Sequence, residues 1–295
     1  MTYSIVARDP RSGELGVAVQ SHWFSVGPIV PWARPGVGAI ATQANVEIAY
    51  GPRGLELLAS GLDAPAALRR LVQADLLADS RQVAIVDAAG TAAAHTGAGC
   101  MAFAGDAQGD GVSCQANIMA SATVWPAMLT AFTAAEGTLT HRLLTALDAA
   151  EAAGGDLRGR QSAALLVVPA AGEAWETVIS LRVEDHPDPL RELARLVALQ
   201  QAYRLAGLGD ERAAAARHDE AAALFLQAAE LAPHSDELRF WAGLGAAQAG
   251  DMDAGLAHVR AAIGAHDGWR ELLRRLTPDV APAAPAVLAL LDAEG

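Results

Sequence analysis

The stretch YSIVARDPRSGELGVAV, residues 3–19, decides the fold class of this chain. Two apolar runs rich in β-forming residues, 3–7 and 15–19, flank the segment Asp9-Pro10-Arg11-Ser12-Gly13. Proline fixes φ in a turn and glycine permits a positive φ, so this segment predicts a tight turn. We therefore expect a β-hairpin whose first strand begins almost at the start of the sequence.

The same reading predicts paired strands and paired helices along the next 165 or so residues. Strands are expected over 36–42, 82–87, 91–95, 162–168 and 176–183, and helices over 51–58, 65–74, 126–135 and 139–153. Strands and helices that come in pairs do not suit a doubly wound sheet, where they alternate singly. The order predicts an α+β fold, a four-layer αββα sandwich with two antiparallel sheets inside and a helix layer on each outer face.

The composition changes after residues 185–189, which read as a proline-stiffened linker. Beyond them strand-forming runs disappear, and three position pairs recur at an offset of 34: Gly209 and Gly243, Phe225 and Val259, Ala228 and Ala262. This period resembles the tetratricopeptide pattern, and a generic helical hairpin is the alternative. We expect a sandwich domain over residues 1–190 and a small all-α repeat segment over 191–295.

The bulk composition limits the function classes. The formal charge is −13 and the chain contains no lysine, which argues against nucleic-acid binding. No apolar stretch is long enough for a membrane span, and the N-terminus does not read as a signal peptide, so we expect a cytoplasmic protein. Cys100 and Cys114 lack metal-site spacing and no phosphate-binding loop occurs, so neither a metal nor another cofactor is expected.

The second residue suggests a chemistry. Methionine aminopeptidase removes Met1 before a small residue, so the mature chain is expected to start at Thr2. The Thr2 hydroxyl would then be a nucleophile, with its own α-amine as the base, because the α-amine has an ordinary pKa of about 7.7–8.0.

Five longer segments strengthen this interpretation, because together they resemble a bacterial family known only as a domain of unknown function and assigned to the N-terminal-nucleophile (Ntn) hydrolase superfamily. The segments are 1–9, 16–21, 30–43, 95–97 and 155–164, and the resemblance spans about residues 1–190. It implies the αββα sandwich, amide-bond hydrolysis and Thr2 as nucleophile. Helical tails accompany some members. The proteasome-like branch uses a lysine near the nucleophile; here that charge would come from Arg8 or Arg34, or the role is unfilled, which favours a mechanism that relies on the α-amine alone.

For each of the other candidate residues, a purely structural role is the alternative to a role in the site. Ser21, Thr42 and Gln43 could line the pocket or cap strand ends, and His95 could be catalytic or structural. Gln115 and Asn117 could form an oxyanion hole. Residues 154–162 carry Asp156, Arg158, Arg160 and Ser162, whose arginines suit a substrate carboxylate, although an Asp156–Arg158 pair could simply brace the loop.

Two functions follow as hypotheses. The first is an amidohydrolase that cleaves a small amide, ureido or isopeptide-type bond of a small-molecule substrate through an acyl-enzyme on Thr2. The second is a non-catalytic scaffold or binding protein that uses the helical segment for partner binding or self-association. Two repeats are marginal alone, so we expect the helical segment to pack either on the sandwich domain or across a homodimer, and we expect the chain to form a homo-oligomer.

Overall fold

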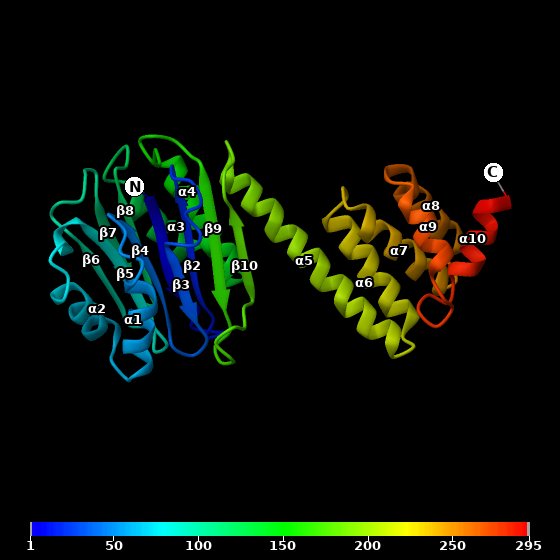
Figure 1. Ribbon diagram of the computed structural model, residues 1–295, viewed down its shortest axis with the longest axis horizontal. Helices are drawn as coiled ribbons and strands as arrows, with labels where there is room; N and C mark the ends of the chain where they lie inside the picture. The colour runs from blue at the N-terminus through cyan, green and yellow to red at the C-terminus, as the bar shows by residue number, and fades with distance from the viewer. Residues whose placement is uncertain (1, 294–295) are drawn as a thin grey trace. The chain divides into compact units, whose positions relative to one another are not determined.

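The computed structural model describes residues 2–293 and divides the chain into two compact units, Met1–Arg195 and Leu196–Gly295. Within the described residues it is a mixed α and β structure with two antiparallel sheets, and most of the helices lie in the second half of the chain (Figure 1). The division lies inside one helix, five residues beyond the expected boundary at 190 (195 − 190).

The larger sheet has six strands with β1 near its centre. In spatial order they are β10 (Ile179–Val183), β9 (Ser162–Val168), β2 (Leu15–Ser21), β1 (Thr2–Arg8), β8 (Val112–Asn117) and β7 (Gly105–Gly109). The expected hairpin is present, because β1 and β2 pair antiparallel from Thr2 opposite Ser21 to Arg8 opposite Leu15. The turn between them contains Gly13 at a φ of 74°, a conformation that glycine adopts at little cost.

The smaller sheet has four strands in sequence order. They are β3 (Pro31–Arg34), β4 (Gly38–Ala44), β5 (Arg81–Asp87) and β6 (Ala92–Thr96). The short strand β3 and the strand β7 were not predicted. The segment GDAQG of β7 contains two glycines and one apolar residue, so it lacks the alternation by which a strand is recognised.

The two sheets face each other through a core of small and β-branched residues. Val6 and Val17 of the larger sheet pack in one cluster with Ala41 and Val86 of the smaller sheet. Because side chains alternate across a strand, every second residue of β1, β2, β4 and β5 points between the sheets. The same alternation determines which polar side chains lie beside Thr2.

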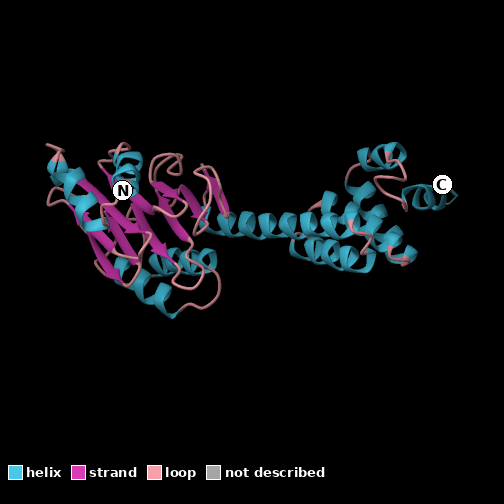
Figure 2. Ribbon diagram, turned by 90° about the horizontal axis from the view of Figure 1, so that it is seen from below, coloured by secondary structure: helices cyan, strands magenta, loops and turns pink. Residues whose placement is uncertain are grey.

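Two pairs of helices pack on the sheets (Figure 2). Helices α1 (Tyr50–Ala59) and α2 (Ala64–Gln73) lie on the smaller sheet, and α3 (Val124–Ala134) and α4 (Leu139–Ala152) lie on the larger one. The approach of α4 is close at Gly16, where an added Cβ would lie 2.7 Å from the Leu143 side chain. The short 3₁₀ helix Ala78–Ser80 precedes β5.

The second unit is helical. Its helices are α5 (Pro189–Ala214), which starts in the first unit, α6 (His218–Leu231), α7 (Asp236–Gln248), α8 (Met252–Ala265), α9 (Gly268–Arg275) and α10 (Ala284–Ala293). Residues 185–189 are therefore not a long extended linker, because α5 begins at the second of the two prolines. Proline suits the first turn of a helix, where its missing N–H has no intrahelical partner. Among residues 2–293, no helix combines the length and apolar character needed to cross a membrane.

Candidate functional site

The Thr2 side chain lies between the two sheets at the start of β1. Thr2 and Val6 are on the same face of the strand by the period of two, and Val6 belongs to the inter-sheet core. Thr2 is 3% exposed, and its Oγ1 donates a hydrogen bond of 3.0 Å to Oγ of Ser21. The predicted removal of Met1 concerns a residue outside the described part of the chain.

A buried hydrogen-bond network of amide side chains surrounds this strand end. Gln43 Nε2 donates to the Thr2 carbonyl at 3.3 Å and to Gln82 Oε1 at 2.7 Å. Ser4 donates to Gln43 Oε1 at 2.6 Å and accepts from Gln115 Nε2 at the same distance. All of these side chains are at most 3% exposed, so the network fixes the start of β1 in a low-dielectric interior.

Gln82 is the centre of the network. Its Oε1 accepts from Gln43 and, at 2.8 Å, from Asn117 Nδ2, while its Nε2 donates to the Ala116 carbonyl at 2.9 Å and to Thr96 Oγ1 at 3.0 Å. Asn117 Nδ2 also lies 3.5 Å from the Thr2 carbonyl, at the limit of hydrogen bonding.

From the sequence, Gln82 was predicted only to be the first residue of a strand. The signal that could have found it is the alternation of Gln82 with Ala84 and Val86, which places an uncharged amide on the core face.

Two residues next to this network have an unusual backbone. Ala44, which follows Gln43, has a φ of 69°, and Ile118, which follows Asn117, has a φ of 53°. A positive φ is uncommon for residues other than glycine, and it is an outlier for a β-branched residue such as isoleucine. Backbone strain of this kind is concentrated at functional sites, so both outliers support a functional role for this end of the sheets.

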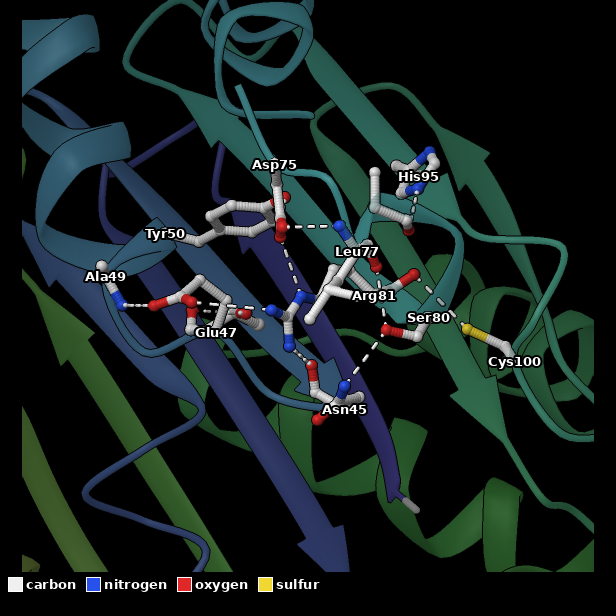
Figure 3. Close-up of polar contacts among 12 residues, drawn as sticks. Asn45, Glu47, Ala49, Tyr50, Asp75, Leu77, Ser80, Arg81, His95 and Cys100 are labelled. Carbon is white, nitrogen blue, oxygen red and sulfur yellow. Dashed lines mark hydrogen bonds and ion pairs between the residues drawn. The ribbon is translucent and has the colours of Figure 1, made fainter. Parts of the chain in front are cut away.

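Thr42 and His95 do not join the network. Both alternate onto the helix-facing side of the smaller sheet, where Thr42 Oγ1 donates to the Glu47 carbonyl at 3.1 Å. His95 Nε2 lies 2.9 Å from the Ala78 carbonyl (Figure 3). Their neighbours Gln43 and Thr96 occupy the inner face instead. A prediction that identifies the correct strand but the wrong alternate residue names side chains on the opposite face of the sheet.

Arg34 lies at the other end of the smaller sheet. It is exposed and pairs with Gly38, whereas Pro31 at the start of β3 pairs with Ala41 near the Gln43 end. Gln43 is the fifth residue after Gly38 in β4, which is about 16 Å along the strand. The structure therefore does not bring Arg34 to Thr2.

In the loop over residues 154–162, Asp156 and Arg158 form the ion pair that was the structural alternative to substrate binding. Asp156 is buried and accepts three hydrogen bonds from Arg158, at 2.8 to 3.1 Å, and one from the His22 amide at 3.2 Å. Ser162 donates to the Trp23 carbonyl at 2.6 Å and accepts from the Val26 amide at 3.1 Å. Arg160 pairs with Glu151 and Asp188. These polar groups hold the loop in place, and their charges are balanced within the protein.

A second polar cluster lies on the helix-facing side of β5 (Figure 3). The buried Arg81 guanidinium contacts Asp75 at 2.8 Å, Glu47 at 3.6 Å and the Asn45 carbonyl. The hydrogen bond from Arg81 is the main cause of the lowered pKa of Asp75. Burial, followed by the hydrogen bond to Asp75, raises the pKa of Tyr50.

A cavity of about 600 Å³ lies beside this second cluster, between α1 and α2, and Tyr50 and Asp75 are among its lining residues. It is on the opposite side of the smaller sheet from the Thr2 side chain. Within residues 2–293, no group of three or more His, Cys, Asp or Glu side chains is placed to hold a metal ion.

Comparison with known proteins assigns the first unit to a family. A family model described as a family of unknown function, DUF1028, matches residues 2–193. This chain belongs to the DUF1028 family. The match covers β1 to β10, the four helices that pack on the sheets and the network around Thr2, and it ends within α5.

A solved structure agrees with this assignment. The crystal structure of a Silicibacter pomeroyi protein, also described as DUF1028, is similar to this chain with a TM-score of 0.62 and 32% sequence identity. The similarity covers 68% of this chain and 88% of that protein. None of the curated proteins matches this chain.

Proposed function

We propose that this DUF1028 protein is an Ntn-type amidohydrolase with Thr2 as its nucleophile. The observation that supports the proposal most is the position of Thr2, which begins the central strand β1 and points between two facing sheets into a network of buried amide side chains. The contacts of α1 and α2 with one sheet and of α3 and α4 with the other are those expected of a four-layer αββα sandwich.

The proposed reaction requires that processing leave Thr2 as the first residue. The neutral α-amine of Thr2 takes the proton of Oγ1, which attacks the carbonyl carbon of the substrate amide. The C–N bond then breaks, the proton passes to the leaving amine, and an ester of Thr2 remains. Water adds to this ester, and its hydrolysis releases the acid and restores the hydroxyl.

The polar neighbours of Thr2 have assigned roles in this mechanism. Ser21 accepts the hydrogen bond of the Thr2 hydroxyl and so orients it before the α-amine takes the proton. Asn117 is the oxyanion donor, because one of its N–H groups is engaged with Gln82 at 2.8 Å and the other has only a 3.5 Å contact. Gln43 and Gln82 are positioning residues that fix Asn117 and the Thr2 backbone.

The proposal extends to the second unit, whose first two helical hairpins we assign as tetratricopeptide-like repeats. The positions that recur at an offset of 34 make equivalent contacts. A Cβ added to Gly209 would lie 2.8 Å from the Phe225 ring, and one added to Gly243 would lie 2.7 Å from Val259. Ala228 and Ala262 are both fully buried.

The test compares Thr2→Ala with Thr2→Ser in the full chain, assayed against a panel of small amides, ureido acids and isopeptides. Alanine and serine are both small, so processing before residue 2 should be unchanged and only the hydroxyl is removed in the first variant. We expect Thr2→Ala to lose more than about a thousandfold in kcat and Thr2→Ser to keep measurable activity. Thr133→Ala removes an exposed hydroxyl of α3 and is the matched control. Equal turnover by wild type and Thr2→Ala would rule out the proposed nucleophile.

A further inference from the structure

Seven connecting segments meet at the end of the sheets where β1 begins. They follow or precede the strand residues that lie level with Thr2, and they are residues 22–30, 45–49, 74–80, 97–104, 118–123, 153–161 and 184–188. We call these segments the Thr2 loops. The opposite end of the sheets carries residues 9–14, 35–37, 88–91, 110–111 and 169–178.

Backbone hydrogen bonds join neighbouring Thr2 loops to one another. The Leu157 amide donates to the Ile118 carbonyl, and the Ile118 amide donates to the Met101 carbonyl. The Gly99 amide donates to the Asp79 carbonyl, and the Asn45 amide donates to the Ser80 carbonyl. Together with the bond from the His22 amide to Asp156 and the bond from the His186 amide to the Gln161 carbonyl, these contacts link all seven segments around the start of β1.

The exposed apolar side chains of the first unit are concentrated on these loops. Among its described residues, nine large apolar side chains are exposed, and eight of them belong to the Thr2 loops. Trp23, Phe24, Met101, Phe103 and Leu157 lie around the larger sheet, and Ile48, Leu76 and Leu77 lie around the smaller one. The ninth, Trp175, lies at the opposite end. Single exposed apolar residues need no explanation, but so one-sided a distribution marks a binding surface.

The Thr2 loops also carry little unbalanced charge. Residues 22–30, 97–104 and 118–123 contain no Asp, Glu or Arg, although the whole chain has a formal charge of −13. In the other loops most charges are paired: Asp156 with Arg158, Glu47 and Asp75 with Arg81, Asp188 with Arg160, and Glu184 with Arg182. Asp79 and Asp185 form no ion pair among the described residues. A ligand that meets this surface therefore finds apolar side chains and few free charges.

We propose that the Thr2 loops bind an uncharged apolar group of the substrate, so that the scissile amide carries a long aliphatic or aromatic chain. This inference rests on the proposed function, because it is the position of Thr2 at the centre of the loops that makes a substrate the occupant. Burial of the chain against Trp23 and Leu157, which are 57% and 67% exposed, supplies the binding free energy.

The kinetic test uses two 4-nitroanilides, of acetic and of octanoic acid, with the full-length protein. We expect the octanoyl compound to have a kcat/KM about a hundredfold higher. Trp23→Ser and Leu157→Ser should each lower the ratio of kcat/KM for the octanoyl compound to kcat/KM for the acetyl compound about tenfold. Trp175→Ser removes a tryptophan at the opposite end that is 77% exposed, and it should change neither kcat/KM value. Equal kcat/KM values for both compounds in all proteins would overturn the inference.

A binding measurement separates this inference from the proposed chemistry. Fluorescence anisotropy with a dye-labelled octanoyl amide is measured on Thr2→Ala, alone and combined with Trp23→Ser or Trp175→Ser. About tenfold weaker binding only with Trp23→Ser supports the apolar site even if no amide is turned over, in which case the proposed function alone fails. Unchanged binding in both combinations overturns the inference. A loss of dimer in sedimentation with unchanged binding also overturns it, because the loops would then be an interface between copies of this chain.

Discussion

At the scale of single residues, two buried glutamines differ in their hydrogen bonds: Gln82 on the smaller sheet and Gln20 on the larger one. Gln82 is fully buried and bonded to Gln43, Asn117, Thr96 and the Ala116 carbonyl. Gln20 of β2 is equally buried, and neither Nε2 nor Oε1 of its side chain has a hydrogen-bond partner among the described residues. A buried amide without partners costs free energy, whereas one with all its bonds made stabilises the fold.

We therefore predict opposite effects for the same substitution at these two positions. Gln82→Leu removes the closest acceptor of the Gln43 and Asn117 amides and should lower the free energy of unfolding by about 2–3 kcal/mol. Gln20→Leu should leave it unchanged or raise it by about 1–2 kcal/mol. Urea unfolding of both variants measures the difference. A strong loss of stability in Gln20→Leu would show that this amide is bonded after all.

The Arg81–Asp75 contact gives a pH-dependent prediction. The folded pKa of Asp75 is lowered, so its ionised form contributes stability above the unfolded pKa, and that contribution is lost as the pH falls through the folded value. The stability difference between wild type and Asp75→Asn should be largest near pH 7 and shrink as the pH falls below the ordinary aspartate pKa. Urea unfolding at a series of pH values checks this. A difference that stays constant from neutral to acid pH would contradict the assigned pKa direction.

At the scale of secondary-structure elements, close helix packing depends on glycines in the second unit. A Cβ at Gly243 of α7 would lie 2.7 Å from the Gly255 carbonyl and from Val259 of α8. At Gly264, also in α8, an added Cβ would have no neighbour within 4 Å. Gly243 is therefore needed for the close approach of α7 and α8, whereas Gly264 is not.

Alanine substitution should reveal this difference. Gly243→Ala forces α7 and α8 apart and should cost about 1–3 kcal/mol of unfolding free energy. Gly264→Ala should be neutral or gain up to about 1 kcal/mol, because alanine is the better helix former. Hydrogen exchange followed by mass spectrometry reports the local stability of α7 and α8. Equal protection in both variants would argue against the close packing.

Much of the element order could be predicted from the sequence, but the faces of the strands could not be assigned with the same success. The predicted strands at 3–7, 15–19, 82–87 and 162–168 each correspond to an observed strand, because continuous β-branched runs are a strong local signal. Thr42 and His95 were chosen as site residues but face the helices, whereas Gln43, which was also chosen, and Thr96, which was not, face the inner side. A one-residue difference reverses the face, and only the pairing of distant strands decides it.

At the scale of the whole molecule, each unit has a core of its own. The inter-sheet cluster and the cluster under α1 and α2 contain residues of the first unit only, and the two helical clusters contain residues of the second unit only. The composition changes near residue 190, five residues before the end of the first unit at Arg195. The family match to residues 2–193 agrees with it, because it covers the first unit alone.

The central claim about the whole chain is that its mature form starts at a reactive Thr2. Peptide-mapping mass spectrometry of the purified protein, after incubation with a β-lactone that acylates active hydroxyl groups, tests this most directly. We predict that the chain begins at Thr2, with one acyl group on its first peptide and none in Thr2→Ala. Chains that all retain Met1, or an adduct that persists in Thr2→Ala, would contradict the account.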